Sequence, residues 1–367
     1  MTASDHIELL WNPADPAFRA DPYPFYDRLR TEAPAYQVPG GSLVVTRYAD
    51  VVSTLRSNDV SRDIEANATL DESNPVAVRR RARRRGAKTI LNLDPPDHTR
   101  LRRLVSKAFT PSAVERLRPR IEQMVDDALD VAAERGSVEL IADLAFPVPF
   151  NVISELLDMP TDRADELRDW SMALTAGLEP AATMAELDEG EAAVMQLIPY
   201  LIEIIEARRA APSDDLLSAL LAVEDEGDTL SHEELISFVV LLYVAGHETT
   251  VNLIGNGALA LLRHRDQLVR WRDDPSLDGS AIDELMRFDG PVQHTVRVAM
   301  SPITFDGVGG EPIVAEPGST ILTTLGGANH DPAMFDDPHR LWLDRPNAAK
   351  HVGFSAGIHY CLGASLA

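Results

Sequence analysis

Residues 353–363 have the sequence GFSAGIHYCLG and contain the only cysteine of this 367-residue chain, Cys361. Two glycines, Gly357 and Gly363, flank this cysteine, and the residues after it favour a helix. A helix N-terminus stabilises a thiolate, and glycine lets the backbone approach the sulfur and a flat ligand without a side-chain clash. The pattern therefore predicts a thiolate that ligates a metal, with a buried and inert cysteine as the alternative.

The composition is that of a globular protein, with 45% hydrophobic and 25% charged residues. A formal net charge of −24 argues against non-specific binding to nucleic acid or to an anionic membrane. A lone cysteine excludes an intrachain disulfide and fits a reducing compartment. Residues 1–16 lack a secretory signal, and the longest apolar stretch, 238–245, is shorter than the ~20 residues of a membrane span. We expect a cytoplasmic protein with no membrane span.

Apolar residues recur at spacings of three and four through residues 97–209, which predicts mostly helical structure interrupted at Gly136, Pro147 and Pro160. A short helix is expected at residues 25–31. Short β-like segments separated by turn residues are expected at residues 42–46, 303–305, 313–314 and 320–324. The chain is thus expected to be mainly α with a smaller β portion, and to form one domain over residues 1–367.

Two capping boxes predict where helices begin. Ser231 with Glu234 opens a long helix that continues to residue 262 and is apolar nearly all round at its centre, so it should cross the core. Ser280 with Asp283 is a second box, and it opens a shorter helix that ends before Gly290.

The segment AGHETT, residues 245–250, breaks the apolar pattern of the long helix with a glycine, an acid and two hydroxyls. Buried polar groups need partners. Threonine hydroxyls that bond back to the helix could widen it and admit a small ligand, while the acid and a hydroxyl could relay protons. A kinked helix with satisfied side chains is the alternative. A zinc motif H-E-x-x-H is not supported, because Val251 stands where its second histidine would be.

Two pairs of polar residues have helical spacing. His98 and Arg102 lie four residues apart on one helix face, where both could reach an anion or simply form an exposed basic stripe. Glu284 and Arg287 lie three residues apart and could form an ion pair, which at a protein surface would contribute little to stability.

Phe354, Gly357, Cys361 and Gly363 together match F-x-x-G-x-x-x-C-x-G, so the chain resembles the cytochrome P450 family at its haem-binding signature. The resemblance implies the cytochrome P450 fold and a haem b whose iron is ligated by Cys361. It further implies that Phe354 packs against the haem near the sulfur and that His359 meets a haem propionate. The family usually has glycine at the position of Ser355.

Other motifs of the family occur in the same order along the chain. Glu284 and Arg287 match its E-x-x-R motif, whose partner arginine would be Arg345 or Arg340. Residues 245–250 match A/G-G-x-D/E-T-T/S, which implies that Ala245 lies at the haem and that Thr249 and Glu248 serve dioxygen binding and proton delivery.

The resemblance also implies a set of propionate-binding residues, which are His98, Arg102, Arg297 and His359. Arginine suits this role because its planar fork matches a carboxylate. The resemblance runs from about Pro22 to Ala367. The family normally continues beyond this point with the rest of a helix and a C-terminal β portion, so we expect a cytochrome P450 domain that lacks its usual C-terminal end.

The resemblance implies monooxygenation, in which one oxygen atom of O2 enters a small, hydrophobic organic substrate. The chain shows no flavin or nicotinamide segment, so electrons are expected from a ferredoxin-type donor with its NAD(P)H-dependent reductase. Arg100, Arg103 and Lys107 could attract an acidic carrier, or they could be scattered surface charges.

The sequence does not identify the substrate. Leu242 and Tyr243 are apolar candidates to face it, and the arginine cluster within residues 79–85 could favour an acidic substrate or partner, or be a solvated loop. A peroxide-driven peroxygenase and a non-enzymatic haem-binding protein are the alternatives in function. A helical protein without haem is the structural alternative.

Overall fold

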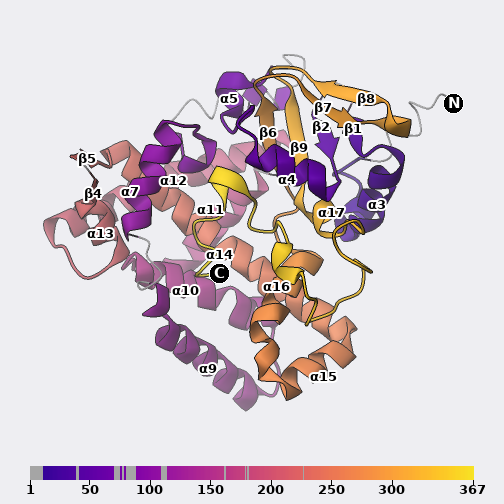
Figure 1. Ribbon diagram of the computed structural model, residues 1–367. Coiled ribbons are helices and arrows are strands. Elements are labelled where there is room, and N and C mark those ends of the chain that lie inside the picture. Colours follow the sequence, from indigo (N-terminus) through magenta and orange to yellow (C-terminus); the bar gives the residue numbers. More distant parts are fainter. Residues whose placement is uncertain are drawn as a thin grey trace. The chain divides into compact units, whose positions relative to one another are not determined.

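The computed structural model describes residues 11–38, 41–69, 75–76, 78–79, 88–108, 114–160, 163–177, 179, 182–225 and 227–367. The chain forms two compact units. One, here called the sheet unit, comprises Met1–Asn74 and Asn256–Cys361, and the other, the helical unit, comprises Pro75–Gly255 and Leu362–Ala367. Figure 1 follows the chain through both units by colour. Helices predominate and strands are few, which confirms the predicted fold class.

The sheet unit contains a five-stranded sheet in the order β1-β2-β9-β6-β3, of which Figure 1 labels β1, β2, β9 and β6. Strands β2 and β9 are parallel, and the other neighbours are antiparallel. A separate hairpin joins β7 and β8. The strands are β1 Ala35–Gln37, β2 Leu43–Val45, β3 Val60–Ser61, β6 His294–Ala299, β7 Ile303–Asp306, β8 Pro312–Ala315 and β9 Thr320–Thr324. All four predicted β segments are confirmed, whereas β1, β3 and β6 were not predicted.

Helices of the sheet unit bury their apolar faces in separate clusters. Tyr26 and Leu29 of α3 are fully buried and pack with Val44 of β2 and Leu322 of β9, which confirms the short helix predicted at residues 25–31. These helices are α2 Pro16–Ala20, α3 Tyr23–Glu32, α4 Tyr48–Arg56, α5 Ile64–Asn67, α15 Arg265–Asp273, α16 Asp278–Asp289 and α17 Leu325–Asn329.

The helical unit confirms the predicted helical region and two of its interruptions. Gly136 ends α9 in the left-handed conformation with φ 72°, and Pro147 is the first residue of α10. A π-helical turn, η2, precedes α10 and was not predicted. The elements are η1 Ile90–Asn92, α7 Asp97–Ala108, α9 Arg118–Arg135, η2 Ile141–Ala145, α10 Pro147–Leu156, α11 Ala164–Ala176, α12 Met184–Ala210, α13 Leu216–Ala222, β4 Glu224–Asp225 and β5 Asp228–Thr229.

The long helix α14, His232–Arg263, begins as its capping box predicts. The Ser231 N–H donates to Glu234 Oε2 at 2.8 Å, and the Glu234 N–H donates to Ser231 Oγ at 3.2 Å. Leu235, Phe238, Val239 and Tyr243 of α14 lie in the core of the helical unit, although only 28% of its most apolar 18-residue stretch is buried. By length and composition α14 could span a membrane, but core helices of soluble proteins share these properties.

The capping box predicted at Ser280 is wrong. Helix α16 begins at Asp278, directly after the 3-10 turn η3, Pro275–Leu277. Ser280 therefore lies inside the first turn of α16, where its hydroxyl donates to the Leu277 carbonyl at 3.1 Å. The helix does end before Gly290, as predicted.

Candidate functional site

Residues 353–361, here called the cysteine loop, close through a backbone hydrogen bond in the sheet unit. The Cys361 N–H donates to the Phe354 carbonyl at 3.0 Å, and the turn η6, Gly357–His359, lies between them. The Cys361 side chain is exposed. Residues 362–366 form turns rather than the expected helix. The loop thus presents a sulfur that is accessible within its own unit.

Gly357 is required by the packing of the cysteine loop against α4. Its φ is 72°, and a Cβ at this position would lie 2.4 Å from the Leu55 carbonyl oxygen of α4. A backbone atom cannot move aside as a flexible side chain can. The contact with α4 therefore requires glycine at this position, and the predicted role of Gly357 toward a flat ligand stays a prediction.

Replacing Gly357 by alanine is expected to lower the free energy of unfolding by roughly 2–5 kcal/mol, because left-handed backbone and overpacking both add cost. Chemical denaturation would measure the loss. Gly279→Ala is the matched control, since Gly279 lies in the first turn of α16 and a Cβ there meets no atom within 4 Å. Equal stability of the two variants would contradict the steric account.

Ser355 adopts the left-handed conformation with φ 63°. This conformation is unfavourable for any residue with a Cβ. Its buried Oγ also has no hydrogen-bond partner among the described residues. Both observations indicate that the protein is less stable with serine at position 355 than it would be with glycine.

Ser355→Gly is expected to raise the free energy of unfolding by about 1–2 kcal/mol, chiefly through relief of the left-handed backbone. Ser355→Ala is the control, because it removes the hydroxyl but keeps the Cβ. Denaturant titration of the three proteins separates the two contributions. If glycine were no more stable than alanine, the backbone would not be the source of the strain.

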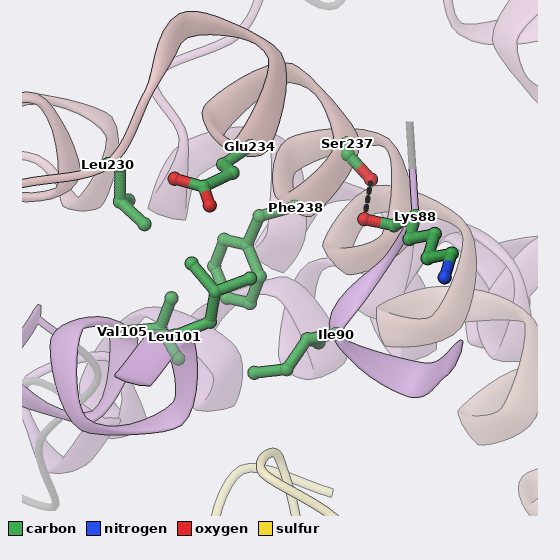
Figure 2. Close-up of a pocket in the computed structure, with 8 residues that line it drawn as sticks. All are labelled: Lys88, Ile90, Leu101, Val105, Leu230, Glu234, Ser237 and Phe238. Carbon is green, nitrogen blue, oxygen red and sulfur yellow. Dashed lines mark hydrogen bonds between the residues drawn. The ribbon is translucent and has the colours of Figure 1, made fainter. Parts of the chain in front are cut away.

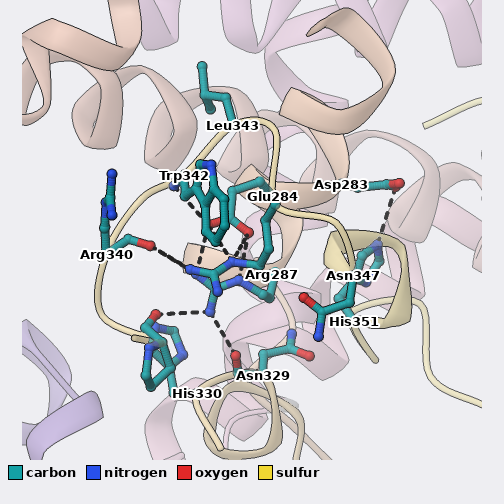
Figure 3. Close-up of polar contacts among 12 residues, drawn as sticks. Asp283, Glu284, Arg287, Asn329, His330, Arg340, Trp342, Leu343, Asn347 and His351 are labelled. Atoms are coloured by element: carbon teal, nitrogen blue, oxygen red, sulfur yellow. Dashed lines mark hydrogen bonds and ion pairs between the residues drawn. The ribbon is translucent and has the colours of Figure 1, made fainter. Parts of the chain in front are cut away.

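Glu284, Arg287 and Arg345 form a buried network in the sheet unit, and Figure 3 labels Glu284 and Arg287. Both oxygens of Glu284 accept from Arg287, from Nε at 2.7 Å and from Nη2 at 2.9 Å. Arg345 Nε lies 3.1 and 3.0 Å from the same two oxygens. Arg345 is therefore the partner arginine, while Arg340 contributes its backbone carbonyl. The reading of this pair as a solvated surface pair is wrong.

His351 connects this region to the cysteine loop. Its Nδ1 accepts from the Gly353 N–H at 3.1 Å, and its Nε2 lies 3.6 Å from Asp283 Oδ1 on α16. Its ring also contacts Phe354, with centroids 5.5 Å apart. Burial lowers the pKa of His351. Sequence reasoning did not single out this residue, whose role depends on contacts between distant segments.

The predicted propionate-binding residues divide between the two units. In the sheet unit, Arg297 lies on β6, is nearly fully buried and donates to the Val296 carbonyl at 2.9 Å, while His359 ends η6. In the helical unit, His98 and Arg102 lie on α7. Burial, and secondly the charge of Arg102, lower the pKa of His98. A neutral imidazole can still donate one hydrogen bond to a carboxylate.

The hydroxyls of residues 245–250 bond back to α14, as the sequence predicts. Thr249 Oγ1 donates to the Ala245 carbonyl at 2.9 Å, and Thr250 Oγ1 donates to the Gly246 carbonyl at 3.4 Å. The Glu248 carboxylate accepts from Asn252 Nδ2 at 3.3 Å. Ala245 is exposed within its unit although it lies in the middle of the helix.

The apolar substrate candidates differ from expectation. Tyr243 is fully buried, and its ring meets Phe150 edge-on in the core of the helical unit. It therefore faces this core rather than a substrate. Leu242 is partly buried and packs against the same core.

Each of the two predicted basic clusters contains an arginine that forms ion pairs with acidic residues of the helical unit. Arg100 forms ion pairs with Asp228 and Glu234, so its charge is compensated. Arg103 and Lys107 are exposed on α7. Arg79 pairs with Asp188 at 3.0 Å and with Glu191. The rest of the cluster within residues 79–85 lies outside the described residues.

A small pocket lies between α7, η1 and the start of α14 (Figure 2). Its volume is about 10 Å³, which suits a single water molecule. Its lining residues are Lys88, Ile90, Leu101, Val105, Leu230, Glu234, Ser237 and Phe238. This pocket is too small for an organic substrate.

Comparison with known proteins identifies the chain. Residues 278–367 match the family model named Cytochrome P450. Cytochrome P450 107B1 of Saccharopolyspora erythraea is 42% identical, over 96% of this chain and 85% of the relative. Vitamin D(3) 25-hydroxylase of Pseudonocardia autotrophica is 41% identical, over 95% and 83% respectively. The crystal structure of CYP164A2 from Mycobacterium smegmatis matches with a TM-score of 0.85 at 39% identity, over 98% of this chain and 89% of that one.

The fold and these similarities define a haem-thiolate oxidoreductase. The chain belongs to the cytochrome P450 family, and it is a monooxygenase that binds haem b.

Proposed function

We propose that this enzyme inserts one oxygen atom of O2 into a small, hydrophobic organic substrate. The supporting observation is the cysteine loop, which exposes the only cysteine of the chain and closes on the Phe354 carbonyl. A relative whose name specifies hydroxylation of vitamin D(3) supports a hydrophobic substrate. We also propose that residues 1–367 act as one domain and that the enzyme is cytoplasmic.

The described residues fit a haem. A thiolate is a ligand that iron accepts readily, and the side chain of Cys361 is accessible within the sheet unit. There, Cys361 would ligate the iron, Phe354 would pack near the sulfur, Gly357 would shape the loop, and Arg297 and His359 would bind propionate. In the helical unit, His98 and Arg102 would bind propionate, while Ala245 and Gly363 would lie against the cofactor.

When bound, haem supplies the redox chemistry of oxygen activation, which a thiolate ligand favours. Thr249 and Glu248 would handle protons. Because the Thr249 hydroxyl donates its hydrogen to the Ala245 carbonyl, its oxygen lone pairs can accept a hydrogen bond from a water molecule. The partly exposed Glu248 carboxylate can take up a proton from solvent and pass it on.

Electrons would come from a ferredoxin-type donor and its NAD(P)H-dependent reductase. The chain shows no flavin or nicotinamide segment of its own. Arg103 and Lys107 are exposed basic residues on α7 that could attract an acidic carrier.

The absorption spectrum of the purified, reduced protein under carbon monoxide tests this proposal. A strongly red-shifted Soret band is expected from haem with thiolate ligation. A band typical of histidine-ligated haem would contradict ligation by Cys361. Turnover driven by hydrogen peroxide but not by O2 with an electron donor would instead favour a peroxygenase.

A further inference from the structure

His247 lies on α14 directly before the proposed acid and threonine, but it faces another direction. Residues two positions apart in an α-helix are separated by about 200° around its axis, so His247 and Thr249 lie on nearly opposite faces. His247 is fully buried. Its ring packs against Phe146 and Phe150 with centroids 5.9 Å apart, and against Tyr243 at 5.3 Å.

The imidazole of His247 makes one hydrogen bond, to its own helix. Its Nδ1 lies 2.7 Å from the Tyr243 carbonyl oxygen, and because a carbonyl only accepts, Nδ1 carries the hydrogen. Its Nε2 is buried and has no hydrogen-bond partner among the described residues. Burial lowers the pKa of His247, which keeps the ring neutral.

This aromatic environment would suit phenylalanine better than histidine. Phenylalanine has no polar atom to bury, whereas a buried nitrogen without a partner is destabilising. The bond from Nδ1 to the Tyr243 carbonyl is the feature that a phenylalanine could not reproduce. The stability of the core alone therefore does not account for histidine at this position.

That bond belongs to a run of side-chain bonds to carbonyls one turn earlier in α14. His247 donates to Tyr243, Thr249 to Ala245 at 2.9 Å and Asn252 to Glu248 at 2.9 Å. When serine or threonine makes a bond of this kind, it slightly destabilises the helix and often bends it. The first lies on the buried face of α14 and the second on the face that carries Ala245, which is exposed within its unit.

Helix α10 packs against α14 at this same point. A Cβ on Gly246 would lie 2.5 Å from Ile153 Cδ1, so the backbone of α14 is in close contact with α10. Helix α10 therefore contacts this turn of α14 both at Gly246 and at the His247 ring, which packs against Phe150.

We propose that His247 is a positioning residue, whose bond to the Tyr243 carbonyl sets the curvature of α14 that orients Glu248 and Thr249. The inference rests on the proposed role of these two residues in proton delivery. The isosteric pair His247→Thr and His247→Val tests it, because only threonine can donate to the carbonyl one turn earlier. His247→Phe keeps the volume of the ring but has no hydrogen-bond donor for the Tyr243 carbonyl. It is the variant to use if threonine or valine at this position prevents folding.

Three quantities should be measured on the holoenzyme: amide hydrogen exchange in residues 245–252, product formed per NAD(P)H consumed, and the thermal midpoint. We expect His247→Val and His247→Phe to alter exchange in this segment and to lower coupling several-fold, while His247→Thr stays close to the parent. The thermal midpoint of His247→Phe should be no lower than that of the parent. If His247 served only to stabilise the fold, its replacement would lower the midpoint. Tyr243→Phe is the control, since it removes a buried hydroxyl without a described partner but no bond to the helix.

Equal exchange and equal coupling in the threonine and valine variants would overturn the inference, as would parental coupling in His247→Phe. Thr249→Ala tests the proposed function separately. If Thr249→Ala leaves coupling unchanged, proton delivery by this pair is wrong. The exchange data would still decide whether His247 shapes the helix.

Discussion

Replacing Arg287 by leucine is expected to lower the free energy of unfolding by about 3–5 kcal/mol, because it removes one partner from a buried ion pair. Glu284 would lose two hydrogen bonds while remaining fully buried. The carbonyls of Asn329 and Pro338 would lose a donor each. This loss is a large part of the ~5–15 kcal/mol that stabilises a typical protein, so little folded protein is expected.

Urea denaturation measures this loss, and an exposed pair in the same unit provides the control. Arg270 donates to Asp344 at 2.7 Å, and their side chains are 42% and 38% exposed. Arg270→Leu should therefore change stability by only about 0–1 kcal/mol. Comparable losses in the two variants would show that burial of the Glu284 network does not matter.

Replacing Cys361 by serine is expected to abolish the thiolate-type Soret band of the reduced carbon monoxide complex. Loss of a residue that only hydrogen-bonds to a metal ligand typically lowers activity by ~10–100-fold. Cys361→Ser removes the ligand itself, so monooxygenase activity should fall by more than that. The physical reason is that a neutral hydroxyl cannot donate electron density to iron as a thiolate does. Spectra and turnover of haem-loaded protein measure both effects.

Tyr360→Phe is the matched control for this substitution. Tyr360 is the exposed neighbour of Cys361, with 47% of its surface accessible, and its loss should leave the thiolate-type band in place. Retention of that band in Cys361→Ser would rule out Cys361 as the ligand, because the chain has no other cysteine.

Local patterns predicted much of the fold. The box of Ser231 and Glu234 is correct because both partners lie within one helical turn and follow a segment that is not helical. The capping box predicted at Ser280 is wrong because η3 leads directly into α16, so the chain is already helical before it reaches Ser280. Strand β6 was missed because its pairing with β9 depends on residues more than 20 positions away.

The candidate site was predictable in its residue types but not in its contacts. Arg340 and Arg345 lie in the same irregular segment, and only the three-dimensional path shows that Arg345 reaches Glu284 with its side chain. The requirement for Gly357 could not be read from its neighbours, because it comes from Leu55, some 300 residues earlier. Likewise, nothing in the sequence shows that Tyr243 and His247 share the buried face of α14.

The sheet unit is assembled from two distant parts of the chain, and this has a consequence during synthesis. Leu43 pairs with Ile321, so the parallel strands β2 and β9 cannot meet until residue 321 has left the ribosome. Residues 75–255 of the helical unit are continuous and become available earlier. Because domains generally fold as their residues emerge, the first strands must wait, with unpaired edges, while the helical unit forms.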